Sequence, residues 1–164
     1  MITQTIFWDT VNYFTPQEFS EDPNEFAHPE LIRRLDFWRE EYGYAIEPSK
    51  APGALARTDM GSRTSYHFAD PFADIQSRAV DVFPQGSIKR AFLLALMGGF
   101  GGVGVYFGKT NNRGEPATMM HVDIRPGPKK VWMWTDEKKY EFYMDRYNGP
   151  ALSAFWQRLD KEDR

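Results

Sequence analysis

The sequence predicts a single α+β domain in which an antiparallel sheet is flanked by helices. Strand patterns cluster in the second half of the chain and helical patterns mainly flank them, which favours this fold class. No internal repeat or linker divides the chain, and 164 residues are enough to bury one hydrophobic core. We therefore expect residues 1–164 to form one domain.

Three segments are predicted to be helices. In the first, from Pro29 to about Tyr42, apolar residues recur every three or four positions, and Gly43 follows as a left-handed C-cap. Residues 87–97 show the same spacing and end at a pair of glycines, and residues 149–159 form the last predicted helix. Thr15-Pro16-Gln17-Glu18 predicts a single capped turn closer to the N-terminus.

Residues 78–83, 103–107, 119–125 and 131–134 are predicted to be strands, and a polar loop, 108–116, joins the second to the third. Side chains alternate between the two faces of a strand. The apolar residues at 120, 122 and 124 should therefore face the core, and those at 119, 121, 123 and 125 a cleft. In the same way positions 80 and 82 should face the core, and positions 79, 81 and 83 the cleft.

Composition and charge exclude several classes of function. The net charge is −3 and no cluster of Lys and Arg is present, which argues against a nucleic-acid binder. No stretch approaches the roughly 20 apolar residues of a membrane span. The first residues lack the basic start and apolar run of a signal peptide, so we expect synthesis in a cytoplasm without an export signal.

Two histidines lie in contexts that suggest a catalytic zinc site. His67 precedes the strand-like run 78–83, and His121 lies within the strand-like run 119–125. A catalytic zinc needs three nitrogen or oxygen ligands and one open position for water, which two histidines and one aspartate can supply. The chain contains no cysteine, so imidazole and carboxylate groups must provide any tight zinc site.

An ordered motif extends this interpretation. It begins with Ser65-Tyr66-His67, continues with Ala79-Val80-Asp81 on a strand, and ends with His121 on a second strand. In this order the chain resembles the zinc D-Ala-D-Ala carboxypeptidases and L-alanyl-D-glutamate endopeptidases, which are relatives of the hedgehog signalling domain. The short versions carried by bacteriophages are especially similar. The resemblance covers most of the chain.

The resemblance implies the hedgehog/D-Ala-D-Ala peptidase fold and a zinc ion held by His67, Asp81 and His121. Relatives usually have the aspartate seven positions after the first histidine, where this chain has Asp74. We prefer Asp81, because its neighbours match the motif and because a strand holds a ligand more rigidly than a loop does.

The general base does not carry over from the family. Many relatives have a glutamate three residues before the last histidine, but this chain has Thr118 at that position. Other relatives have a histidine two residues before the last histidine, but this chain has Met119 there. Asp123 shares the strand face of His121, so it could be the base or could orient an imidazole. Glu115, just before the strand, is the other candidate.

The implied substrate is a peptidoglycan stem peptide, whose carboxylates call for a cation. Arg57 lies about where relatives carry an arginine that clamps a carboxylate, with Arg63 and Arg125 as weaker candidates. Ser65 resembles the family serine and is expected to have a structural or substrate-contacting role.

We therefore predict a zinc peptidase acting at the bacterial cell wall, encoded by a phage and reaching the wall through a holin or as part of a virion. The D-Ala-D-Ala and L-Ala-D-Glu bonds both remain open as the bond that is cut. The alternative is a non-catalytic structural or binding module of a phage particle that keeps the fold and associates with virion proteins.

Overall fold

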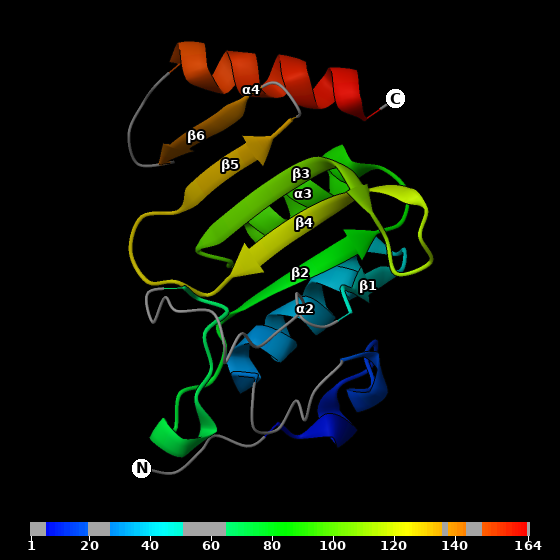
Figure 1. Ribbon diagram of the computed structural model, residues 1–164, viewed down its shortest axis with the longest axis vertical. Coiled ribbons are helices and arrows are strands. Elements are labelled where there is room, and N and C mark those ends of the chain that lie inside the picture. Colours follow the sequence, from blue (N-terminus) through cyan, green and yellow to red (C-terminus); the bar gives the residue numbers. More distant parts are fainter. Residues whose placement is uncertain (1–5, 20–26, 51–64, 136–137, 144–148, 164) are drawn as a thin grey trace.

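The computed structural model describes residues 6–19, 27–50, 65–135, 138–143 and 149–163. Within these residues the α-helices are α2 (Pro29–Tyr42), α3 (Ile88–Met97) and α4 (Gly149–Glu162), and the 3-10 turns are η1 (Trp8–Thr10), η2 (Pro16–Glu18) and η3 (Pro71–Ala73). The strands are β1 (Ile46–Pro48), β2 (Ala79–Pro84), β3 (Gly102–Thr110), β4 (Pro116–Asp123), β5 (Lys130–Trp134) and β6 (Lys139–Tyr143). The predicted α+β class is confirmed (Figure 1).

The ends of the helices follow from local chemistry. At the start of α2, the ring Nδ1 of His28 accepts a hydrogen bond from the Glu30 N–H at 3.2 Å. At its end, Gly43 adopts the left-handed conformation that favours glycine, with φ of 74°. Ser87 caps α3 by accepting a hydrogen bond from the Arg90 N–H. The predicted bounds of the first two helices are thus confirmed to within one residue.

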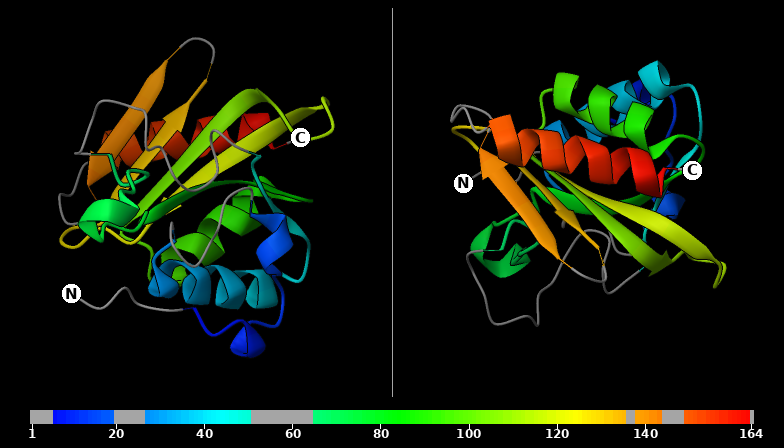
Figure 2. Two further views of the ribbon diagram at one scale, coloured as in Figure 1. Left: turned by 60° about the horizontal axis from the view of Figure 1, so that its bottom comes forward. Right: turned by 90° about the horizontal axis from the view of Figure 1, so that it is seen from above.

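One face of the sheet carries the hydrophobic core. The alternate strand residues that point into it are Val80, Val82, Val103, Val105, Met120, Val122, Val131 and Met133. All three described α-helices contribute side chains to the same core, α2 through Trp38, α3 through Phe92 and α4 through Phe155. Figure 2 shows α2 and α3 lying together against this face, and Figure 1 shows α4 beside β6. The intervening strand residues are left for the opposite face, which we call the site face.

The sheet is mixed, so the predicted antiparallel sheet is wrong in one pairing. The strand order is β1-β2-β4-β3-β5-β6, and β3 pairs with β5 in parallel. Because β2 already occupies the free side of β4, β5 is added beside β3. The chain reverses direction from β3 to β4 and again from β4 to β5, so β3 and β5 run the same way.

Among the described residues, no helix is both long enough and apolar enough to cross a membrane.

Candidate metal centre

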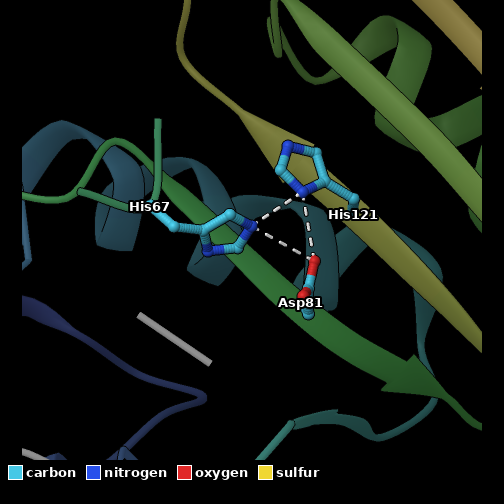
Figure 3. Close-up of side chains that lie close together, drawn as sticks. All are labelled: His67, Asp81 and His121. Atoms are coloured by element: carbon cyan, nitrogen blue, oxygen red, sulfur yellow. Dashed lines mark hydrogen bonds and ion pairs between the residues drawn. The ribbon is translucent and has the colours of Figure 1, made fainter. Parts of the chain in front are cut away.

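Three side chains converge on one point of the site face (Figure 3). Nε2 of His67 lies 3.0 Å from Nδ1 of His121 and 3.4 Å from Oδ1 of Asp81. Nδ1 of His121 lies 3.1 Å from the same carboxylate oxygen. All three residues are buried, and together they form a group that could hold a metal ion.

Strand register places two of the three residues side by side. Asp81 on β2 is the direct antiparallel partner of His121 on β4. The flanking apolar residues, Val80 and Val82 on one strand and Met120 and Val122 on the other, are fully buried in the core. Since neighbouring side chains point to opposite faces, burial of these four residues forces Asp81 and His121 onto the site face. The predicted alternation is confirmed for both strands.

The segment before β2 brings His67 to the pair. The backbone of this segment is tied to the approach to β2, because the Arg78 N–H donates to the Tyr66 carbonyl at 2.8 Å. Inside the segment, the Ser65 hydroxyl accepts a hydrogen bond from the His67 N–H at 3.3 Å. Ser65 therefore stabilises the local turn that carries the histidine, and it also lines the neighbouring pocket.

The structure brings Asp81, and not Asp74, to the two histidines. Asp74 lies in a small loop that Asp70 and Ile75 close through a pair of backbone hydrogen bonds, of 2.8 and 2.9 Å. Its φ of 58° is left-handed, a conformation that aspartate tolerates in tight turns. The spacing from His67 to Asp81 is longer than in the family motif, and the additional residues form a compact loop between His67 and β2.

Asp123 lies behind His121, on the side of the ring that faces away from Asp81. Its Oδ2 lies 3.0 Å from Nε2 of His121. Arg125 in turn donates from its Nε to both oxygens of the same carboxylate, at 2.7 and 3.0 Å, and its Nη2 forms an ion pair with Oδ2. Asp123 is completely buried, so its side chain orients the imidazole and holds Arg125 in place.

These contacts also determine the protonation of the ring. Burial by itself lowers the pKa of His121, but the carboxylates of Asp123 and Asp81 outweigh burial and raise it to about 9. Burial likewise opposes ionisation of Asp123, yet hydrogen bonds from Arg125 and His121 hold the pKa of its carboxyl below the ordinary value. An ionised Asp123 only accepts, so Nε2 of His121 must carry a proton. The lone pair of Nδ1 is then available to a metal once that nitrogen is deprotonated.

Two glycines of β3 make room for the site. Gly104 is the partner of His121 on one side and of Trp132 on the other, and the indole of Trp132 lies directly over it. A Cβ at Gly104 would come within 2.3 Å of that ring, and a Cβ at Gly102 within 2.2 Å of the Asp123 carboxylate. The sequence signal was a pair of glycines two residues apart, Gly102 just before and Gly104 inside the predicted strand 103–107, a spacing that places both on one strand face.

A pocket of about 510 Å³ opens over the three converging side chains. Besides those three, its lining residues are Ser65, Tyr66, Tyr106, Lys109, Met119, Arg125 and Trp132. The indole N–H of Trp132 donates to the Tyr106 hydroxyl at 2.8 Å, which joins two of these walls. Tyr106, Lys109 and Trp132 were not among the site residues predicted from the sequence.

The predicted catalytic residue Glu115 is not brought to the pocket. Glu115 precedes β4 at the turn that joins it to β3, where its carboxylate is exposed and accepts hydrogen bonds from Asn111 and Arg113 at 3.0 and 2.9 Å. Six residues of strand, roughly 20 Å, separate it from His121. Arg57, predicted to clamp a substrate carboxylate, lies outside the described residues, as does Arg63.

The spacing of the three side chains suits a small tetrahedral metal ion. Ligands at zinc–nitrogen and zinc–oxygen bond lengths would lie roughly 3.3 Å from one another. The observed separations of 3.0, 3.1 and 3.4 Å fall around this value. Nδ1 of His67 is buried and has no hydrogen-bond partner among the described residues, so the polar contacts of the ring with His121 and Asp81 are all made by Nε2. A metal bound at Nε2 would fix this ring.

Comparisons of the chain with models of protein families, with curated proteins and with solved structures found no match.

Proposed function

We propose that the chain is a zinc-dependent peptidase that hydrolyses peptidoglycan stem peptides, either as a phage lysin or as a component of a virion. The observation that carries the proposal is the convergence of His67, Asp81 and His121 at the base of an open pocket. Three ligands beneath an open cavity are the arrangement that catalytic zinc sites use, whereas structural zinc sites are closed by four protein ligands. The order of these residues in the family motif supports the choice of substrate.

The donor atoms favour zinc. Two imidazole nitrogens and one carboxylate oxygen form a ligand set found in zinc peptidases, and with no cysteine in the chain these are the ligand types available. Asp123 supports the same assignment, because histidines that bind zinc commonly donate their other ring N–H to a carboxylate. When bound, zinc would polarise a carbonyl and lower the pKa of water towards neutrality.

The chain's own residues would orient the metal ligands and the substrate. Asp123 keeps the imidazole of His121 in the tautomer that frees Nδ1, and Arg125 keeps Asp123 ionised. The indole of Trp132 and the ring of Tyr66 flank the guanidinium of Arg125, at 5.4 and 4.6 Å from their centroids, and form one wall of the pocket. The substrate backbone would lie between this wall and the metal ligands.

One observation favours the second candidate, a non-catalytic metal-holding module of a phage particle. Of the described residues that line the pocket, Asp81 alone carries a carboxylate, and it belongs to the ligand group. The carboxylate of Asp123 already binds His121 and Arg125. Glu115 precedes β4, at the end of that strand that is far from His121. A hydrolase of this class needs a group that takes a proton from water.

The test compares metal content with turnover. Protein purified without added metal is analysed for zinc, then incubated with purified peptidoglycan with and without chelator, and the muropeptides are examined by mass spectrometry. We expect one zinc per chain and new amine and carboxyl ends that disappear with chelator and in His121→Ala. His28→Asn, which changes a histidine outside the ligand group and the pocket lining and keeps a helix cap, serves as the control. Full zinc occupancy without new ends would favour the non-catalytic module.

A further inference from the structure

A β-bulge in β3 changes which face of the sheet Lys109 occupies. Along β3, Val103, Val105 and Phe107 point into the core, and strict alternation would send residue 109 to the same side. The register shifts between Tyr106 and Lys109, however, so that Tyr106 pairs with Met119 while Lys109 pairs with Ala117. Three steps on β3 thus correspond to two on β4, which is the signature of one extra residue.

The extra residue re-aims the lysine towards the pocket. Gly108, inside the bulge, has a φ of 69°, a conformation that favours glycine. Ala117 lies on the same face of β4 as His121, since the two are four residues apart, and directly paired residues share a face. Lys109 is therefore on the site face, and it lines the pocket above the candidate metal centre. Bulges are frequent beside active sites, where they redirect a side chain in this way.

The two cations of the described pocket lining differ in what they already bind. Arg125 makes several contacts with the buried carboxylate of Asp123 and lies over two aromatic rings. Lys109 is exposed, forms no ion pair with a described carboxylate, and has its ammonium 5.8 Å from the centroid of the Tyr106 ring. Of these two, Lys109 is thus the cation that can bind an incoming anion without giving up an ion pair with a described carboxylate.

We propose that Lys109 binds a free carboxylate of the peptide substrate and thereby selects acidic peptides and sets their register over the metal centre. This inference rests on the proposed function and adds a specificity-determining residue to it. Ala117, beside Lys109, lies four strand residues from His121, or roughly 13 Å, so the lysine contacts the substrate away from the reacting bond. An ammonium on a flexible stem suits this task, because it acts as a point charge that tolerates several carboxylate orientations.

The experiment uses the zinc-loaded full chain and a synthetic stem pentapeptide, L-Ala-γ-D-Glu-L-Lys-D-Ala-D-Ala. Two further peptides carry an amide in place of the C-terminal carboxylate or in place of the α-carboxylate of the D-Glu residue. KM and kcat are measured for each, and binding to the metal-free chain is measured by calorimetry as a readout that does not depend on turnover. The variants are Lys109→Met and, as a matched control, Lys139→Met. Lys139 lies on the same sheet face but is paired with Glu141 at 2.6 Å and does not line the pocket.

The expected result is a weakening of affinity for the unmodified peptide by roughly tenfold or more in Lys109→Met, seen in KM and in calorimetry, with little change in kcat. One of the two amidated peptides should bind wild type and Lys109→Met equally, and it identifies which carboxylate the lysine contacts. Lys139→Met should match wild type throughout. If wild type cleaves the pentapeptide, and Lys109→Met has the same KM as wild type for each of the three peptides, the inference is overturned while the proposed function stands. If wild type neither binds nor cleaves any of the peptides, both are overturned.

Discussion

Oδ2 of Asp123 lies 3.0 Å from Nε2 of His121, while the opposite nitrogen of the same ring, Nδ1, lies 3.1 Å from Oδ1 of Asp81. The imidazole of His121 thus connects the buried carboxylate of Asp123 to the group of side chains that faces the pocket. Because Asp123 contacts the His121 ring only at Nε2, the nitrogen that faces away from the ligand group, its position suits orientation of a metal ligand better than removal of a proton from a substrate water.

The first prediction tests this role. Asp123→Asn keeps the shape of the side chain but removes the charge that stabilises the Nε2–H tautomer, so zinc affinity should fall by about 10- to 100-fold. Affinity is measured by competition with a chromophoric chelator, and circular dichroism verifies the fold. Asp160→Asn, at an exposed position on α4, should bind zinc like wild type. Unchanged zinc affinity in Asp123→Asn together with lost catalysis would instead make Asp123 the base.

The second prediction separates the two aspartates that follow His67. Asp81→Ala should abolish tight zinc binding, because it removes one of three converging ligand atoms. Asp74→Ala should bind zinc nearly as well as wild type, since Asp74 lies in the loop closed by Asp70 and Ile75. Equilibrium dialysis followed by elemental analysis compares the two variants. Loss of zinc from Asp74→Ala with retention by Asp81→Ala would reverse the assignment.

The third prediction concerns pH. A metal at Nδ1 competes with a proton, and the carboxylates around His121 raise its pKa to about 9 in the metal-free chain. Between pH 7 and pH 8 most molecules must therefore release this proton on binding, so the zinc association constant should rise by about tenfold over that unit. Titrations at several pH values check the slope. An affinity that does not change between pH 7 and pH 8 would show that the ring is already deprotonated.

The same pKa shift predicts how the metal-free chain responds to base. A folded-state pKa raised from 6.5 to about 9 contributes stability that is fully present below pH 6.5 and is lost as pH rises through 9. The melting temperature of the metal-free protein should accordingly fall between pH 7 and pH 10. Asp123→Asn should show a smaller fall, because it lacks one of the carboxylates that favour the charged ring. An equal dependence of melting temperature on pH in both proteins would contradict the raised pKa of His121.

The sequence was sufficient to predict the parts of the site that strand periodicity controls. Burial of Val80, Val82, Met120 and Val122 leaves only one face for the neighbouring residues, so the alternation of apolar residues already indicates that Asp81 and His121 share a surface. Helix ends were predictable for a similar reason, since Gly43 has a strong local preference for its conformation.

Other features depend on long-range pairing that a local pattern does not contain. The parallel pairing of β3 with β5 arises because β2 occupies the free side of β4. The bulge at Gly108 reverses the face of Lys109, although the local sequence resembles a polar loop. Proximity in sequence was also misleading for Glu115, because β4 begins at Pro116 and its length separates the glutamate from His121. The short strand β1, of three residues, is below the length at which periodicity can be recognised.

The last prediction concerns the contact between Gly104 and Trp132. A Cβ at residue 104 would lie 2.3 Å from the nearest indole atoms, so Gly104→Ala must displace the ring from the wall of the pocket. We expect a destabilisation of about 1 to 3 kcal/mol, as for other insertions into a packed site, with a change in tryptophan fluorescence. The matched comparison is a double-mutant cycle with Trp132→Leu, in which the smaller side chain leaves room for the methyl group. Gly104→Ala should then cost much less in the Trp132→Leu background than in wild type, as measured by denaturant unfolding. Equal costs in the two backgrounds would mean that the glycine is required by the backbone of β3 and not by the indole above it.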